Sequence, residues 1–288
     1  MTEERIVEGV RLSNPDKVLW PEQGITKAEL ADYYVAVAER MLPHVARRPV
    51  TMVRCPTGAE KKCFYQRHAG SGVLPQLREI KVPGFDEAYL YVEDLPGLIA
   101  MVQMGTLEIH PWGVTVDDPD RPDRIIFDLD PDEGLDFSDV IAAALEVRER
   151  LRAIELESLV KTTGGKGLHV VVPIEPVTAW PAAKTFAKSF SDAMAADSPA
   201  RYLTRISKAE RTGRIFIDYL RNDPTSTAVG PYSSRSRPGA PVAMPIEWGE
   251  LQGALDPAAF NVKTASAHIA SVADPWAGID KVRQRLPA

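Results

Sequence analysis

The segment 124–131 (RIIFDLDP) constrains the fold most, because it combines a buried strand with two carboxylates at its end. Residues 125–127 form an apolar run typical of a strand inside a sheet, and Asp128 and Asp130 stand where that strand emerges. Side chains two apart on a strand point to the same face, so both carboxylates can converge on one divalent cation, which would relieve their repulsion. A solvent-facing acidic turn is the alternative, and this segment alone leaves both open.

A third acid, Asp218, lies within another apolar segment, 214–220 (RIFIDYL). An unpaired carboxylate in a buried strand is costly, so this side chain needs a partner. The partner is either Arg214 or Arg221, or a metal shared with the two upstream acids if the two strands are neighbours. In the second case three carboxylates could hold the metal pair used for in-line phosphoryl transfer.

The turn 161–169 (KTTGGKGLH) supplies charge that complements these acids. Its three glycines allow backbone N–H groups to approach an anion closely, and Lys166 and His169 can add further donors. The spacing is not that of a P-loop, and a hairpin that needs positive φ is the alternative. The lysine inside the turn and the acids upstream favour phosphate contact.

Two further patterns could contact nucleotides or nucleic acid. Arg235 and Arg237 alternate in a loop rich in Pro, Gly, Ser and Arg, where they could clamp a triphosphate or be solvated. Phe64 and Tyr65 lie among Lys and Arg residues, a mixture that suits base stacking beside phosphate contacts. The alternative is that one of the two rings belongs to the core.

The overall charge conceals a division along the chain. The 288 residues carry 34 basic and 40 acidic side chains, and the net charge of -6 argues against a sequence-independent nucleic-acid coat protein. Residues 11–70 carry ten basic and six acidic side chains, residues 201–240 carry eight and three, and residues 79–140 carry three and sixteen. Two basic stretches therefore flank an acidic centre.

Three observations bear on localisation. No run of about 18 apolar residues is present, which excludes a membrane-spanning helix. The acidic N-terminus lacks the apolar core of a secretory signal. Cys55 and Cys63 are the only cysteines, and we expect two ordinary thiols in a reducing cytoplasm rather than a disulfide framework or a zinc site.

Hydrophobic periodicity predicts helices and short strands in mixed order. Thr26 and Glu29 form the pattern of a capping box before a helix over about 27–42. Apolar spacing with Pro and Gly boundaries predicts further helices over 96–105, 138–152 and 180–196. The same signals predict strands over 50–54, 88–92, 107–110 and 214–220, and a strand–turn–strand unit over 158–173. Short helices should end the chain, and no internal repeat or linker is visible.

Several segments in this order resemble one family, the polymerase domain of the bacterial end-joining ligase D, in the archaeo-eukaryotic primase superfamily. They are LSNPDKVLWPEQGITKAEL, CFYQRH, LEIH, FDLDP, GGKGLHV, IFIDYLRN and PYSSRSR. The resemblance implies an α+β fold, with a primase-type catalytic core of mixed and antiparallel sheets flanked by helices. It also implies a single domain over 1–288, with a DNA-contacting part over about 1–75, a catalytic core over about 76–245 and a helical tail over about 246–288.

The implied activity is template-directed nucleotidyl transfer by a two-metal mechanism, which extends primers and fills gaps at DNA breaks with a preference for ribonucleotides. The implied cofactors are two Mn2+ or Mg2+ ions, and the substrates are NTPs or dNTPs. By resemblance the catalytic metal ligands are Asp128, Asp130 and Asp218. The implied nucleotide-binding residues are His110, Thr163, Lys166, His169, Arg235 and Arg237. The implied DNA contacts are Lys17, Lys27, Arg54, Phe64 and Tyr65.

The resemblance also implies partners and a place of action. Lys17 and Lys27 match lysines that recognise a downstream 5′-phosphate, whereas Val53 and Ser226 stand where the family pattern has Lys. The expected partners are gapped or broken DNA and, because only one module is present, a separate DNA ligase and an end-binding protein for non-homologous end joining. The expected location is cytoplasmic, at a bacterial nucleoid. Two other functions stay open: a DxD-type nucleotide-sugar transferase and a non-catalytic DNA-end-binding module.

Overall fold

The computed structural model describes residues 4–70, 72–206, 210–253 and 255–287. The chain forms two compact units, each assembled from three stretches of sequence. The N-terminal unit comprises Met1–Trp112, Val229–Met244 and Ala258–Asp274. The second unit comprises Gly113–Ala228, Pro245–Pro257 and Pro275–Ala288. The stretches alternate along the chain, and the expected three-part division of a single domain stays a prediction.

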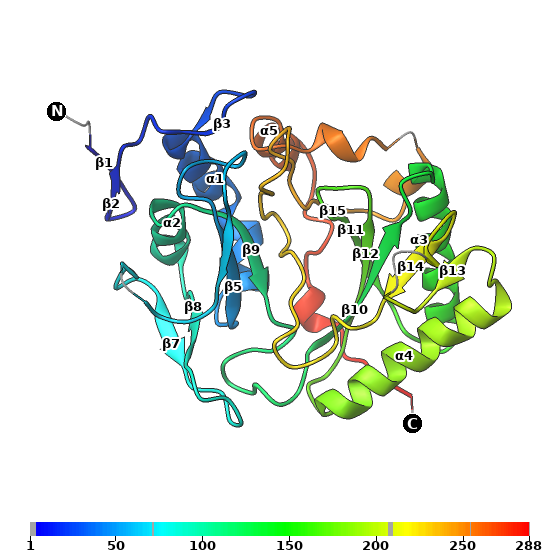
Figure 1. The fold of residues 1–288 in the computed structure, drawn as a ribbon. Coiled ribbons are helices and arrows are strands. Elements are labelled where there is room, and N and C mark those ends of the chain that lie inside the picture. Colours follow the sequence, from blue (N-terminus) through cyan, green and yellow to red (C-terminus); the bar gives the residue numbers. More distant parts are fainter. Residues whose placement is uncertain (1–3, 71, 207–209, 254, 288) are drawn as a thin grey trace. The chain divides into compact units, whose positions relative to one another are not determined.

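The N-terminal unit combines helices α1 (Lys27–Val45), α2 (Leu95–Gln103) and α5 (Ala265–Ser271) with short antiparallel sheets (Figure 1). A three-stranded sheet has the order β6-β5-β9, with bounds Phe64–Gln66, Val50–Arg54 and Thr106–Pro111. Three two-stranded sheets complete it: β1 (Glu4–Val7) with β2 (Val10–Ser13), β3 (Val18–Trp20) with β4 (Ile25–Thr26), and β7 (Arg78–Ile80) with β8 (Tyr89–Tyr91).

Helix α1 begins where the sequence predicts it. The Thr26 hydroxyl accepts a hydrogen bond from the Glu29 backbone N–H at 3.2 Å, and the Glu29 carboxylate accepts one from the Thr26 backbone N–H at 2.7 Å. The predicted capping box is therefore confirmed. The apolar side chains at helical spacing, such as Leu30 and Met41, are fully buried, and the helix runs past the expected end at 42 to Val45.

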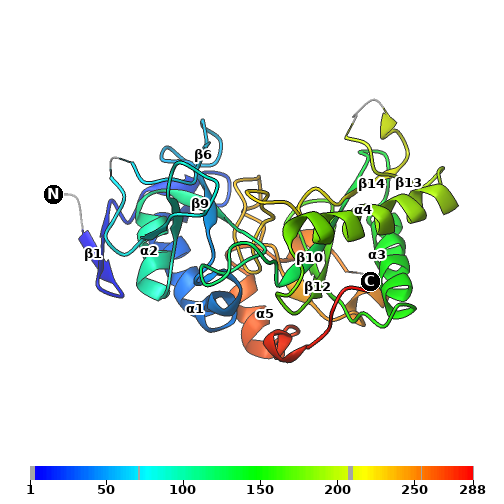
Figure 2. The same cartoon turned by 90° about the horizontal axis from the view of Figure 1, so that it is seen from below.

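The second unit is built on a six-stranded sheet of order β13-β14-β10-β12-β11-β15 (Figure 2). In that order the strands are Tyr202–Leu203, Ile215–Asp218, Arg124–Pro131, Leu168–Pro173, Leu159–Thr162 and Pro245–Ile246. Neighbouring strands are antiparallel, except that β13 and β14 are parallel. Helices α3 (Phe137–Arg152) and α4 (Trp180–Asp197) pack on the sheet, where Phe190 of α4 meets Phe127 of β10 with ring centroids 4.8 Å apart. The expected α+β class with mixed and antiparallel sheets is confirmed.

The expected strand is present as β10, and it continues through both aspartates to Pro131 rather than ending before them. Phe127 and Leu129 are fully buried, while the aspartates alternate with them on the other face. The register sets Asp128 directly opposite both His169 on β12 and Asp218 on β14. Three segments that are far apart in the sequence therefore meet at one position of the sheet.

The remaining elements agree with the prediction of short helices near the C-terminus. Three 3-10 turns, Glu250–Gln252, Pro257–Ala259 and Ile279–Lys281, accompany α5. No helix in the described stretches is both long and apolar enough to cross a membrane.

The expectation of two free thiols is wrong. Cys55 and Cys63 form a disulfide in the N-terminal unit, with their Cα atoms 4.3 Å apart. The cause is the pairing of β5 with β6, which places Arg54 opposite Phe64 and so brings the residues just beyond that pair together. The expectation of free thiols rested on the presence of only two cysteines and on a reducing cytoplasm, and the hairpin register that brings them together was not anticipated.

Candidate active site

Three carboxylates and a histidine lie on adjacent strands of the second unit. His169 Nε2 lies 3.3 Å from Asp128 Oδ1. Arg221, just after β14, bridges two of the acids: its Nε is 3.2 Å from Asp128 Oδ2 and its Nη2 is 3.0 Å from Asp218 Oδ2. The predicted proximity of the strands that carry Asp128 and Asp218 is therefore confirmed, and so is the alternative ion pair between Asp218 and Arg221.

Asp130 has a different partner. Its Oδ2 accepts a hydrogen bond from Arg211 Nη1 at 2.8 Å, and 54% of its side chain is exposed. Arg211 also lies over the ring of Phe216 on β14, 4.2 Å from the ring centroid. The two aspartates of the DLD segment thus contact different arginines in this arrangement.

The ionisation of this cluster is uneven. Burial opposes the charge of Asp128, but His169, Arg221 and Lys161 together hold its pKa well below the usual range. Burial raises the pKa of Asp218, and the charge of Asp128 raises it further against the opposing effect of Arg221. Burial and Asp128 likewise raise the pKa of Asp130. The positive charges near Asp130 and Asp218 therefore do not offset the effects that raise their pKa values.

His169 is a neutral side chain at neutral pH. Burial and the nearby charge of Lys161 lower its pKa to about 4, although Asp128 acts in the opposite direction. Its Nδ1 atom is buried and has no hydrogen-bond partner among the side chains and backbone that the structure describes. A buried ring nitrogen without a partner is unusual in a folded protein.

The cluster fits a hard divalent cation by its chemistry rather than by its present geometry. Within residues 4–70, 72–206, 210–253 and 255–287, no three His, Cys, Asp or Glu side chains gather closely enough to hold a metal. The donor set nevertheless consists of three carboxylates on two paired strands, two of them with raised pKa values. Oxygen donors of this kind are those that Mg2+ and Mn2+ take in proteins. The assignment of Asp128, Asp130 and Asp218 as metal ligands stays a prediction.

The glycine-rich turn joins β11 to β12 against β10. Gly164 has φ of +65°, and a Cβ on Gly167 would lie 2.5 Å from the carbonyl oxygen of Leu129, so the turn needs glycine at both places. The Thr163 hydroxyl donates to the Gly167 carbonyl at 3.1 Å, and Lys166 is exposed at the tip. The hairpin interpretation is confirmed, and it leaves the phosphate interpretation standing because the lysine points to solvent.

Sequence reasoning missed two charged residues of this cluster, Lys161 and Arg211. Lys161 is 2% exposed, pairs in register with His169, and acts electrostatically on both His169 and Asp128. A lysine inside an apolar strand is the signal that could have singled it out. Arg211 and Arg221 lie close to the acids only because of the fold, although Arg221 had been considered as a partner of Asp218.

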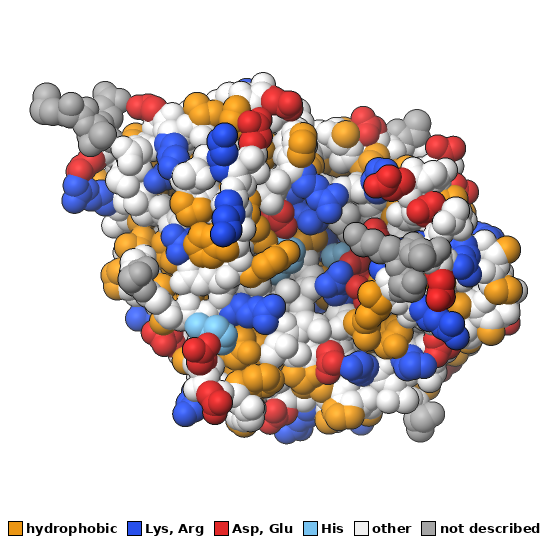
Figure 3. Space-filling model, in the orientation of Figure 1, with side chains coloured by type: hydrophobic (Ala, Val, Ile, Leu, Met, Phe, Trp, Pro, Cys, Tyr) orange, Lys and Arg blue, Asp and Glu red, His pale blue; other side chains and the backbone are white. Residues whose placement is uncertain are grey.

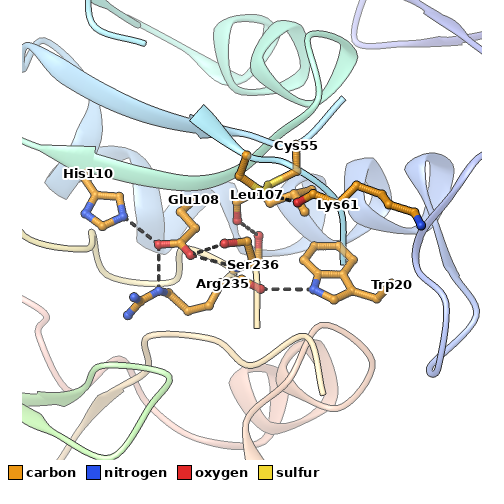
Figure 4. The surroundings of a disulfide bond; sticks show 10 residues. Trp20, Cys55, Lys61, Leu107, Glu108, His110, Arg235 and Ser236 are labelled. Carbon is orange, nitrogen blue, oxygen red and sulfur yellow. Dashed lines mark hydrogen bonds and ion pairs between the residues drawn. A yellow bond between two sulfur atoms is a disulfide. The ribbon is translucent and has the colours of Figure 1, made fainter. Parts of the chain in front are cut away.

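A second polar cluster lies in the N-terminal unit, and its centre, Glu108, was also missed (Figure 4). His110 Nε2 and Arg235 Nε lie 2.8 and 2.9 Å from Glu108 Oε2. The backbone N–H and the hydroxyl of Ser236 donate to Oε1 at 2.9 and 2.6 Å. The structure thus brings the predicted residues His110 and Arg235 together through an acid on β9. Arg237, two residues further on, is exposed.

The aromatic pair is exposed on the same unit. Phe64 is 41% and Tyr65 72% exposed, so neither ring belongs to the core. Arg54 lies 5.3 Å from the Phe64 ring centroid and donates to Gln66 at 2.6 Å. In Figure 3 Lys and Arg side chains are interspersed with hydrophobic ones on this face of the N-terminal unit. Exposed rings beside a guanidinium suit contact with unpaired bases.

The two predicted lysines differ in exposure. Lys27 is 6% exposed and its Nζ donates to the Ser13 carbonyl at 2.7 Å and to Gln103 at 3.2 Å. Burial, and then the nearby charge of Lys17, lowers the pKa of Lys27. Lys17 is half-buried and donates to the carbonyl of Pro56. The role of both lysines in phosphate recognition stays a prediction.

Comparison with known proteins identifies the family. A family model described as "LigD, primase-polymerase domain" matches residues 26–276. The chain belongs to the LigD primase-polymerase family. The family resemblance drawn from the order of the sequence motifs is thereby confirmed.

The sequences of curated relatives align with most of this chain. The multifunctional non-homologous end joining protein LigD of Pseudomonas aeruginosa is 34% identical, over 97% of this chain and 34% of the relative. The protein of the same name from Mycolicibacterium smegmatis is 36% identical, over 85% of this chain and 32% of the relative. The chain thus spans about a third of the length of these curated relatives. The solved polymerase domain from Mycobacterium tuberculosis Ligase D, in complex with DNA, matches with a TM-score of 0.86 and 30% identity over 97% of this chain and 99% of that one.

Membership of this family makes the chain a nucleotidyltransferase of the polymerase type. It favours that function over nucleotide-sugar transfer, which the DxD pattern by itself leaves open. Polymerases of this kind use nucleoside triphosphates and divalent metals in general.

Proposed function

We propose that this chain extends DNA primers at gaps and breaks by template-directed nucleotidyl transfer, with a preference for ribonucleotides. The observation that carries the proposal is the register that sets Asp218 and His169 on either side of Asp128. That register joins carboxylates to a neutral, partly unsatisfied imidazole, which is the mixture needed to hold metals beside a phosphate. The relatives' names refer to end joining, and the matched M. tuberculosis domain is in complex with DNA.

Asp128, Asp130 and Asp218 would hold two Mn2+ or Mg2+ ions. When bound, such ions lower the pKa of an attacking hydroxyl and stabilise the leaving phosphate. Arg221 favours the ionised form of both Asp128 and Asp218, which is the form that a metal ligand needs. His169, neutral at neutral pH, contributes hydrogen bonding rather than charge.

The incoming nucleotide is proposed to contact the residues that the family resemblance assigns to it. In the second unit, Thr163 holds the turn that presents Lys166, a cation for the triphosphate, and His169 adds a ring nitrogen. In the N-terminal unit the proposed contacts are His110, Arg235 and Arg237. Arginine suits this role because its planar donors match phosphate oxygens in pairs.

DNA is proposed to bind the N-terminal unit through Arg54, Phe64, Tyr65, Lys17 and Lys27. The most exposed of them, Tyr65, provides a face on which a base can stack. Tyr65→Ala should weaken binding of a gapped duplex by about 1–3 kcal/mol, the usual value of one stacked base. Ile206→Ala removes an exposed apolar side chain of the second unit and serves as the matched control. Equal affinities of the two variants in a fluorescence-anisotropy titration would remove Tyr65 from the DNA contact.

The downstream 5′-phosphate is proposed to meet Lys17 and Lys27. Val53 is buried in β5 at a position where a lysine would add a third charge, so we expect the phosphate to stimulate extension only weakly. We also propose that a DNA ligase and an end-binding protein complete the repair.

Extension of a 5′-labelled primer on gapped and ungapped templates, with and without the downstream phosphate, tests this function. Reactions with NTPs and dNTPs in Mn2+ or Mg2+ measure the sugar preference at the same time. Extension of both templates, faster with NTPs and little changed by the phosphate, is the expected result. Binding of the gapped duplex with no incorporation under any condition would favour a non-catalytic end-binding module instead.

A further inference from the structure

Glu108 is the hub of a hydrogen-bonded cluster that the family motifs do not reveal. It lies on β9 between the core residues Leu107 and Ile109, both fully buried, and shares its face of the strand with His110. Strand alternation therefore brings the Glu108 carboxylate within 2.8 Å of His110 Nε2. The same carboxylate reaches Arg235, which is 127 residues away in the chain.

Both carboxylate oxygens of Glu108 are used. Oε2 lies in hydrogen-bonding distance of His110 Nε2 and Arg235 Nε, and Oε1 accepts from the backbone and the hydroxyl of Ser236 (Figure 4). Glu108 is only 5% exposed, and a carboxylate so deeply buried persists only when its lone pairs are satisfied. Burial opposes its charge, but His110, Arg235 and Ser236 hold its pKa well below the usual range. The carboxylate is therefore ionised whenever the protein is folded near neutral pH.

The backbone next to Arg235 is anchored independently of Glu108. The Ser233 hydroxyl accepts from the Ile109 N–H at 2.8 Å, and the Ser234 hydroxyl donates to the Leu107 carbonyl at 2.7 Å. Both serines are fully buried, and Ser234 also meets the Tyr34 hydroxyl at 3.0 Å. These contacts fix the loop just before Arg235, whereas Glu108 holds the Ser236 backbone just after it together with the side chains of His110 and Arg235.

We propose that Glu108 is a positioning residue that sets the directions of His110 and Arg235 for the incoming nucleotide. The inference rests on the proposed function of those two residues. Because the ionised Glu108 can only accept, Nε2 of His110 donates to it, and this bond fixes the orientation of the imidazole ring. Arg235 is held through Nε, which fixes the plane of its guanidinium. A side chain that is aimed in advance binds its ligand without losing further freedom.

Glu108→Gln is the direct test, because the amide keeps the size and removes the charge. One end of the amide is a donor, so it cannot accept from Ser236 and Arg235 together. We expect KM for the nucleotide in primer extension to rise about ten- to a hundredfold, with a smaller change in kcat. Glu93→Gln is the matched control, since Glu93 in the same unit also contacts two arginines, Arg47 and Arg78, and KM should stay within twofold of the unchanged chain (about the error of such a fit).

A mutant cycle separates positioning from a merely structural role. If Glu108 acts through His110 and Arg235, then adding Glu108→Gln to a variant that carries both His110→Ala and Arg235→Ala raises KM little further, by about twofold or less. A further rise equal to that of the single variant would overturn the inference. Arg235→Ala with an unchanged KM would instead contradict the proposed role of Arg235 itself, so the two failures are distinguishable.

A second variant tests the inference if the Glu108→Gln protein does not fold. Glu108→Asp keeps the charge but withdraws it by one methylene, so the same cycle is then measured with aspartate. Titration with a fluorescent NTP measures nucleotide binding without turnover, and this second readout does not depend on the chemical step. A KM and a nucleotide affinity both unchanged in Glu108→Asp would overturn the proposal, and weakening of both would support it.

Discussion

The two polar clusters of this chain both contain buried carboxylates, but the pKa values of these carboxylates are shifted in opposite directions. In the N-terminal unit one carboxylate, Glu108, is surrounded by donors, and its pKa is held below the usual range. In the second unit three carboxylates share two arginines and a neutral histidine, and the pKa values of Asp130 and Asp218 are raised. The carboxylate of the first cluster is fully paired within the protein, whereas in the second cluster the positive charges of Lys161, Arg211 and Arg221 do not offset the effect of burial on Asp130 and Asp218.

The difference in pairing corresponds to two different roles, which are orientation of a ligand and binding of a cation or substrate. A fully paired carboxylate stabilises a fixed arrangement, which suits the orientation of a ligand. Carboxylates that lie close together lower the stability of the fold, and proteins retain them at places where a cation or substrate binds. The comparison therefore predicts that the same chemical change, acid to amide, has opposite consequences in the two places.

The largest effect is expected for catalysis in the second unit. Asp218→Asn should reduce metal-dependent primer extension by more than about a hundredfold, since loss of even an outer partner of a metal costs ten- to a hundredfold. Asp192→Asn, which changes an acid paired with Lys188 on α4, is the control and should extend primers normally. Undiminished extension by the Asp218 variant would remove that residue from the metal site.

The next effect concerns the cross-link that only the N-terminal unit carries. Replacing Cys55 and Cys63 by serine should lower the free energy of unfolding by about 2–3 kcal/mol, because the loop closed by the disulfide is short. Denaturant unfolding of the unchanged chain with and without a dithiol reductant measures the effect. The double variant is the control, and reductant should leave its stability unchanged. If reductant leaves the unchanged chain equally stable, the cross-link does not form in solution.

Acid-to-amide changes in the two clusters should differ in sign. Glu108→Gln leaves buried donors unsatisfied and should cost about 1–3 kcal/mol of stability. Asp218→Asn removes a carboxylate that faces Asp128 and should leave the thermal unfolding midpoint unchanged or raise it. Calorimetry of both variants at neutral pH makes the comparison. Equal losses of stability would contradict the distinction between the fully paired carboxylate and the carboxylates with raised pKa values.

The smallest expected effect is the pH dependence of the stability differences between the unchanged chain and these two variants. Glu108 has a lowered folded pKa, so its contribution is complete above the unfolded pKa of about 4.3 and is lost as pH falls further. The stability gap between the unchanged chain and Glu108→Gln should therefore shrink in acid. Asp218 has a raised pKa, so the unchanged chain should gain stability relative to Asp218→Asn as pH falls. Thermal melts over a pH series check whether the two gaps move in opposite directions.

Local signals explain how much of this could be predicted from the sequence. The capping box at Thr26, the apolar run before Asp128 and the glycine turn are each defined by a few consecutive residues, and the structure has a helix start, a strand and a hairpin turn at these places. Family resemblance supplied His110 and Arg235 but not the acid between them. Glu108 could have been suspected, because it is a charged residue two positions from a histidine on a strand.

The residues that sequence reasoning missed depend on contacts across long separations. Arg211 meets Asp130 across 81 residues, and Arg235 meets Glu108 across 127. The disulfide depends on the register between β5 and β6, which places Arg54 opposite Phe64. Strand registers are set by packing of the whole unit, so no local pattern reports them.

Single-nucleotide incorporation by the unchanged chain tests the central claim most directly. Four primer–templates that differ only in the templating base are offered each NTP in turn, with Mn2+, Mg2+ or chelator. The account predicts extension by the complementary nucleotide, with either ion and not with chelator. Incorporation that ignores the templating base, or no incorporation while the DNA is still bound, would contradict a template-directed nucleotidyltransferase.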